Sequence, residues 1–167
     1  MFFLDNNRKN RSGQLLVEGL VALSILTIVI LGVVAILSRS FRQTRIVFET
    51  AIASNLAAEG AEVAKNIIDR NVWTNPFRPW NEGISEGKFS VNYNSESFGS
   101  YQDRFIRFNP QTGIYSSQDG VLTPFERVIE MSIISPNLVK IKSTVTWQIP
   151  GTPEREVSVE HNVLGWR

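Results

Sequence analysis

The sequence predicts an α+β fold, in which a long N-terminal transmembrane helix continues into an amphipathic helix packed on a small antiparallel β-sheet. Three observations lead to this prediction. An apolar run covers residues 15–37, a helical pattern without proline follows it to about Asn71, and the C-terminal part of the chain alternates apolar with polar residues. The 167 residues are enough for one small domain in addition to the apolar segment.

The apolar run is long enough to cross a membrane. As a helix, residues 15–37 would extend about 34 Å at 1.5 Å per residue, and a hydrocarbon core is about 30 Å thick. Secretory signal peptides have apolar cores of about 7–15 residues and end in a small-x-small cleavage site. Because this run is longer and no such site follows it, we expect a retained span.

The charges are distributed unevenly along the chain. The first 13 residues carry +2 of a net charge of +1, so the remainder sums to −1 and nothing in it indicates a nucleic-acid partner. The basic N-terminus favours an N-in, C-out orientation, although three arginines also follow the run: Arg39, Arg42 and Arg45. The absence of cysteine excludes disulfides, thiolate zinc sites and a thiol nucleophile.

Glu18 is the one charged residue inside the apolar run. A carboxylate costs about 2.5–3.5 kcal/mol at the centre of a membrane helix, and less near its end. One explanation is that Glu18 interacts favourably with the helix N-terminus. Another begins with cleavage between Gly13 and Gln14, which would create a positively charged α-amino group at Gln14. In a bundle of such helices, Glu18 of one subunit could then neutralise the amine of the next.

The stretch from Ser12 to Ile25, SGQLLVEGLVALSI, resembles the class III signal sequence of type IV prepilins and pseudopilins, and most closely the minor-prepilin variety. The resemblance implies cleavage after Gly13 by a prepilin peptidase/methyltransferase, N-methylation of Gln14, and Glu18 as the assembly glutamate. The sequence departs from the family pattern at two positions. Leu15 stands where Ser or Thr is common, and Gln14 replaces the usual Phe.

An apolar stripe at spacings of seven and four residues predicts the face of the second helical segment that packs on a head domain. Small residues flank this stripe. The stripe consists of Phe41, Phe48, Ile52, Leu56, Val63 and Ile67, and the flanking residues are Ala51, Ala53, Ala57, Ala58, Gly60, Ala61 and Ala64.

The C-terminal part predicts an antiparallel sheet with one buried face. An irregular connection is expected at 74–87, a turn at 109–113 with a short return at 114–115, and a loop at 116–123. Strands are expected at 88–93, 104–108, 125–134, 138–149 and 155–164. The predicted organisation is therefore a leader peptide at 1–13, a transmembrane helix at 14–37, an amphipathic helix at 38–71 and a head domain at 72–167.

The sequence offers little catalytic chemistry. His161 is the sole histidine, and its place in an alternating strand predicts a core or edge residue, with no metal, no cofactor and no catalytic role. We therefore expect a protein that is not an enzyme. A group of aromatic residues around the irregular region is expected to pack the loop onto the sheet, with an adhesive or subunit-contact surface as the alternative: Trp73, Phe77, Trp80, Tyr93, Phe98 and Tyr101.

These patterns together lead to a functional hypothesis. The resemblance implies a minor pilin, a single-pass protein of the bacterial inner membrane that is assembled with other pilin subunits into a type IV pilus or related filament at the cell surface. Its partners would be the peptidase/methyltransferase, other subunits and membrane lipid. The alternatives are a pseudopilin of a type II secretion or DNA-uptake system, a plain single-span protein with a binding domain, and a hydrolase behind an uncleaved anchor.

Overall fold

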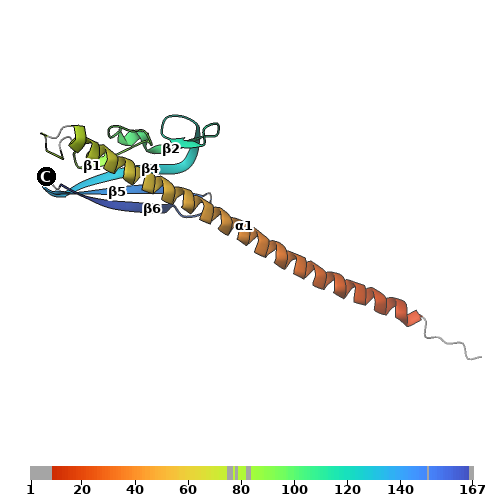
Figure 1. Cartoon of the computed structure of the whole chain (residues 1–167). Helices are drawn as coiled ribbons and strands as arrows, with labels where there is room; N and C mark the ends of the chain where they lie inside the picture. Colours follow the sequence, from red (N-terminus) through yellow and green to blue (C-terminus); the bar gives the residue numbers. More distant parts are fainter. Residues whose placement is uncertain (1–8, 75–76, 78, 82–83, 150, 166–167) are drawn as a thin grey trace, which may run out of the picture. The chain divides into compact units, whose positions relative to one another are not determined.

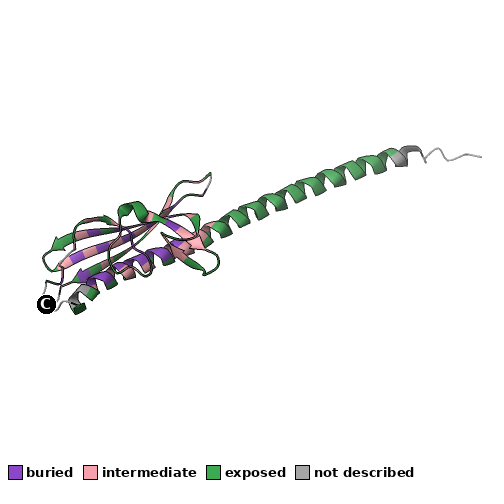
Figure 2. Cartoon of the chain, turned by 90° about the horizontal axis from the view of Figure 1, so that it is seen from above, coloured by how far each residue is buried: buried purple, intermediate pink, exposed green. Residues whose placement is uncertain are grey.

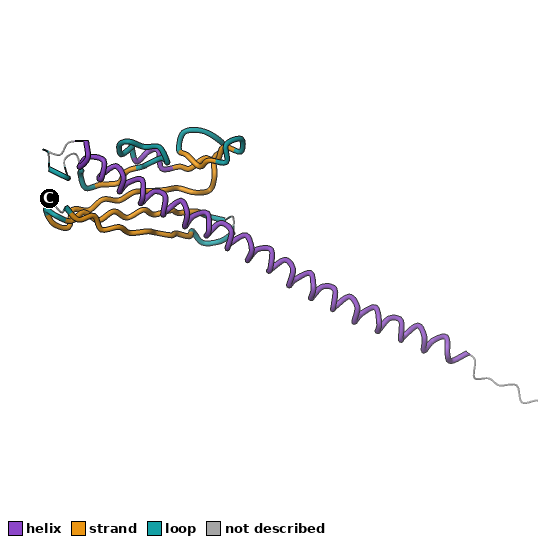
Figure 3. The backbone as a smooth tube through the Cα atoms, in the orientation of Figure 1, coloured by secondary structure: helices purple, strands orange, loops and turns teal. Residues whose placement is uncertain are grey.

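The protein divides into two compact units, residues 1–47 and 48–167. The computed structural model describes residues 9–74, 77, 79–81, 84–149 and 151–165. Helix α1 (Lys9–Thr74) begins in the first unit and ends in the second, three residues beyond the expected end at Asn71 (Figure 1). A single antiparallel sheet follows it, so the predicted α+β class is confirmed (Figure 3).

The sheet lies wholly in the C-terminal unit. Its strands are β1 (Gly87–Phe89), β2 (Phe105–Asn109), β3 (Ile114–Ser116), β4 (Val121–Ser135), β5 (Leu138–Trp147) and β6 (Arg155–Leu164). Among the described residues the strand order is β3-β2-β4-β5-β6, and β1 pairs with part of β4. A short 3₁₀ helix, Tyr101–Arg104, leads into β2.

Strands β2, β3, β5 and β6 lie within two residues of their predicted bounds, whereas β4 begins four residues early and β1 is shorter than expected. Strand β6 has the expected bounds and β5 is two residues shorter. The loop expected at 116–123 is shorter than predicted, because β4 begins at Val121, which pairs with Phe108 of β2. The strand expected at 88–93 ends at Phe89, since Asn92 leaves the sheet and its side chain exchanges two hydrogen bonds with Ser117.

The turn expected at 109–113 is present. The Asn109 side-chain carbonyl accepts from the backbone N–H groups of Gln111 and Thr112, at 2.9 and 3.3 Å. Gly113 then takes a φ of 71°, a left-handed conformation that glycine adopts without steric cost. Its N–H donates to the Asn109 backbone carbonyl at 2.8 Å, which closes the turn and returns the chain into β3.

The helix face that packs on the sheet follows the predicted stripe only in part, at Leu56 and Ile67. Phe41 and Phe48 are exposed, and Val63 is only half-buried. Small residues that flank the stripe form most of the buried face, which Figure 2 shows along the part of α1 in the C-terminal unit. Its members recur every three or four residues: Ala53, Leu56, Ala57, Gly60, Ala61, Ala64, Ile67 and Ile68. The prediction was wrong at Phe41 and Phe48 because it ranked residues by hydrophobicity, whereas small side chains let the helix backbone approach the sheet closely.

Gly60 marks the closest approach. A Cβ atom built on Gly60 would lie 2.7 Å from Oγ of Ser143 and 2.8 Å from Cδ of Arg127. Both of these residues are fully buried in the sheet. Real Cβ contacts are longer than this, so glycine is needed for space here rather than for backbone conformation.

Arg127 is the largest fully buried side chain of the described residues, with 1% of its surface exposed. Its Nη1 donates to the backbone carbonyl of Leu56 and to the carboxylate of Glu59, both at 3.0 Å. Its Nη2 donates to the backbone carbonyl of Val91 at 2.7 Å. One guanidinium on β4 therefore connects helix α1 to the segment that follows β1.

We predict that Gly60→Ala destabilises the C-terminal unit. The added methyl group must displace Ser143 and Arg127, and overpacking of this kind costs about 1–3 kcal/mol. Urea unfolding of the full chain in detergent micelles measures the change. The matched control is Gly32→Ala, because no atom lies within 4 Å of a Cβ at Gly32. Equal unfolding midpoints for the two variants would contradict the prediction.

Arg127→Ala should be more damaging. It leaves the Val91 carbonyl without this donor, at a cost of about 1–3 kcal/mol, and it opens a cavity where a fully buried side chain stood. Arg70→Ala is the control, since Arg70 pairs with Glu96 at 3.0 Å on an exposed surface. Such exposed pairs contribute about 0–1 kcal/mol. Thermal unfolding followed by circular dichroism separates the two cases, and a Tm for Arg127→Ala close to that of Arg70→Ala would refute the assignment.

Candidate functional site

Gly13, Gln14 and Glu18 all lie in α1, within the N-terminal unit. Gln14 and Glu18 are four residues apart, so their side chains project from one face of the helix in successive turns. All three residues are exposed, and no atom lies within 4 Å of a Cβ built on Gly13. Among the described residues, the structure gives Glu18 no hydrogen-bond or ion-pair partner. The structure thus places the predicted residues together on an open helix surface.

In the described part of the chain, the apolar run after Gln14 is left exposed. Its large apolar side chains, from Leu15 to Leu37, are each between 51% and 71% exposed. By length and composition this helix can cross a membrane, and it is the one such helix in the described part of the chain. In water, leaving each of these side chains uncovered forgoes about 1.5–3 kcal/mol of burial energy. Lipid or neighbouring helices would recover that energy.

The polar side chains of the run are satisfied within the helix. The hydroxyl of Ser24 donates to the carbonyl of Leu20, and that of Thr27 donates to the carbonyl of Leu23, both at 2.8 Å. A membrane interior offers no water to such groups, so internal bonding of this kind suits a spanning segment. Glu18 therefore stands out as the group of the run that needs an external partner.

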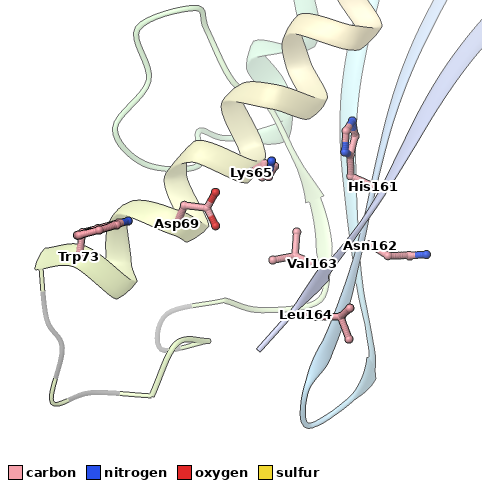
Figure 4. A pocket seen from close by; sticks show the side chains of 7 residues that line it. All are labelled: Lys65, Asp69, Trp73, His161, Asn162, Val163 and Leu164. Carbon is pink, nitrogen blue, oxygen red and sulfur yellow. The ribbon is translucent and has the colours of Figure 1, made fainter. Parts of the chain in front are cut away.

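In the C-terminal unit, a cavity of about 440 Å³ lies between helix α1 and the end of strand β6 (Figure 4). Three of its side chains follow one another at intervals of four along the helix, and the strand contributes a run of four residues. The lining consists of Lys65, Asp69, Trp73, His161, Asn162, Val163 and Leu164. Sequence reasoning singled out Trp73 and His161 but missed Lys65 and Asp69, although their regular spacing with Trp73 placed all three on one helix face.

The sequence predicts that His161 is either a core or an edge residue. In the structure it lies on the edge strand β6. Its side chain is 34% exposed, and its Nε2 lies 3.9 Å from Oε1 of Glu62 on α1. In the described residues, no group of three or more His, Cys, Asp or Glu side chains lies close enough to hold a metal ion.

The aromatic residues divide into two classes, so the expectation that they pack the loop is only partly right. Trp80 is buried, and Phe98 packs on Phe89 with ring centroids 5.4 Å apart. The side chains of Trp73 and Phe77, in contrast, are 82% and 100% exposed. Tyr93 and Tyr101 are exposed to a lesser degree, and the guanidinium of Arg104 lies over the Tyr101 ring.

The face of the sheet opposite α1 is polar. Lys140 donates to Glu160 at 2.7 Å, and this hydrogen bond holds the pKa of the Glu160 carboxyl below its usual value. Glu130, Lys142 and Glu160 stand side by side across β4, β5 and β6. Such cross-strand pairs of opposite charge suit a solvated surface.

Comparison of the chain with protein-family models, with curated proteins and with solved structures found no match.

Proposed function

We propose that this protein is a minor pilin, cleaved after Gly13 by a prepilin peptidase/methyltransferase, N-methylated at Gln14, and assembled with other subunits into a type IV pilus or related filament. One observation carries the proposal: the exposed apolar run of α1, residues 15–37, is long enough to span a membrane and holds a single acid, Glu18, that lacks a partner among the described residues. The resemblance of residues 12–25 to the prepilin signal sequence supports the same reading.

The helix would have two environments. In the bacterial inner membrane, lipid covers the apolar side chains of residues 15–37, with the N-terminus in the cytoplasm and the C-terminal unit outside. In the filament, the helices of neighbouring subunits cover them instead. Because apolar contact alone allows many axial positions, the charge pair between Glu18 and the amine of a neighbour's Gln14 would select one of them.

The C-terminal unit would serve as the head of the subunit. Its sheet has one face covered by α1 and one polar face, which fits a domain exposed to water. The same features suit a pseudopilin of a type II secretion or DNA-uptake system, which would share the cleavage and assembly chemistry. A plain single-span protein with a binding domain would share neither.

The first prediction concerns processing. The purified protein should begin at Gln14 and carry one added methyl group, whereas Gly13→Val should keep its leader, because a side chain at the cleaved position crowds the peptidase. Intact-protein mass spectrometry after co-expression with a prepilin peptidase measures both species.

Gly19→Val is the matched control for this experiment, since Gly19 lies on the same helix and is equally open. It should be processed normally. A wild-type protein that keeps Met1 would favour the plain single-span alternative, and a processed Gly13→Val variant would contradict the role given to Gly13.

The second prediction concerns assembly. Glu18→Ala should be cleaved like the wild type but should enter filaments at least about ten-fold less, because loss of the carboxylate removes a charge pair worth more than about 1.4 kcal/mol in a lipid-like environment. Quantitative immunoblotting of sheared filaments against the membrane fraction measures the ratio. Glu18→Asp retains the charge and should recover part of the incorporation. Normal incorporation of Glu18→Ala would rule out the charge pair.

A further inference from the structure

Strand β6 forms one edge of the sheet among the described residues. Its ten residues pair with β5 without a bulge, and the sequence from Arg155 to Leu164 contains no proline or lysine. Natural edge strands are usually protected by such features, because their free N–H and C=O groups otherwise pair with another chain. The outer edge of β6 is therefore regular, and its protection is limited to the charged side chains of Arg155, Glu156 and Glu160.

Helix α1 does not fully cover the sheet at this edge. On β5, every residue that faces α1 is buried to 3% exposure or less, as Val139, Ile141 and Trp147 illustrate. On β6, the residues of the same face remain half-buried until Val163. Helix α1 thus covers β5 fully but covers β6 only in part.

The cavity described above lies at this uncovered margin. Asn162 belongs to the outer face of β6, and Figure 4 shows its side chain directed away from α1. Since Asn162 nevertheless lines the cavity, its backbone forms part of the wall. The opposite wall includes Trp73, an indole that is 82% exposed. A large exposed aromatic across a cavity from a free strand edge is typical of a surface that a partner covers.

From these observations we propose that β6 binds an extended peptide segment of a partner protein, which adds a strand to the sheet and alternates apolar with basic residues. The apolar side chains occupy the cavity beside Trp73 and Val163. The basic side chains lie on the outer face, where cross-strand neighbours stand about 4.5–5.5 Å apart.

The outer face of β6 determines the charge of the partner. Its exposed residues are two acids and two neutral polar groups: Glu156, Ser158, Glu160 and Asn162. A lysine or arginine opposite Glu156 forms a favourable pair, and one opposite Glu160 shares a carboxylate already bonded to Lys140, whereas an acid at either place is repelled. A second copy of β6 would bring no cation to this face. Charge complementarity therefore favours a different, basic strand over self-pairing.

The test uses the full chain in detergent micelles and three capped heptapeptides: alternating Val and Lys, alternating Val and Glu, and the Val/Lys peptide with proline at its centre. Isothermal titration calorimetry should give the Val/Lys peptide a Kd at least about ten-fold below those of the other two, because proline removes a ladder hydrogen bond and glutamate introduces repulsion. Hydrogen exchange should slow at β6 amides when the Val/Lys peptide binds.

Four variants locate the site. Trp73→Ala should weaken binding about ten-fold, whereas Tyr93→Ala, another exposed aromatic, should not. The double variant Glu156→Gln/Glu160→Gln should abolish the preference for Val/Lys over Val/Glu, whereas Glu130→Gln, on the outer face of β4, should preserve it.

Several results would overturn the proposal. They are the failure of all three peptides to bind, equal binding of the proline peptide, and a dimer in sedimentation that Trp73→Ala dissociates, which would identify a second copy as the occupant. The assay needs neither cleavage nor a filament, so its outcome is independent of the proposed function.

Discussion

The buried guanidinium of Arg127 is the interaction on which the C-terminal unit depends. It lies on β4 and bonds to the carbonyls of Leu56 and Val91 and to the carboxylate of Glu59. A charge this deeply buried is stable only with such partners. Since those partners come from α1 and from the segment after β1, the position of the helix on the sheet and the path of the chain are fixed together.

The small residues on the buried face of α1 make the hydrogen bonds of Arg127 possible. Glycine at position 60 leaves room for the arginine, whose Cδ would lie 2.8 Å from a Cβ there. With leucine or phenylalanine at the position of Gly60, the helix would stand farther from the sheet, and Arg127 could not reach the carbonyl of Leu56. Close packing and the buried hydrogen bonds thus require each other.

The coupling between close packing of α1 and the hydrogen bonds of Arg127 explains which parts of the fold could be predicted from the sequence and which could not. The alternation of β5 and β6 is a local pattern of period two, so it predicted both strands and the buried face of β5. The buried face of α1 depends on what lies opposite, and the largest side chains, such as Phe48, pointed to the wrong face. Arg127 stands in the buried alternation between Phe125 and Ile129, a position where charge is rare, and that anomaly was the available signal. The site at Gly13, Gln14 and Glu18 came from a linear motif, which needs no tertiary information.

The two units leave different kinds of surface uncovered. In the N-terminal unit the uncovered surface is the apolar run 15–37, with satisfied backbone groups and one acid, Glu18, so it calls for lipid or other helices. In the C-terminal unit it is the edge of β6, where backbone groups and Trp73 face solvent together. Apolar contact has little directional preference, whereas strand pairing fixes register and direction. The apolar run can hold the protein in a membrane while the edge of β6 selects a partner, because the two surfaces share no residues.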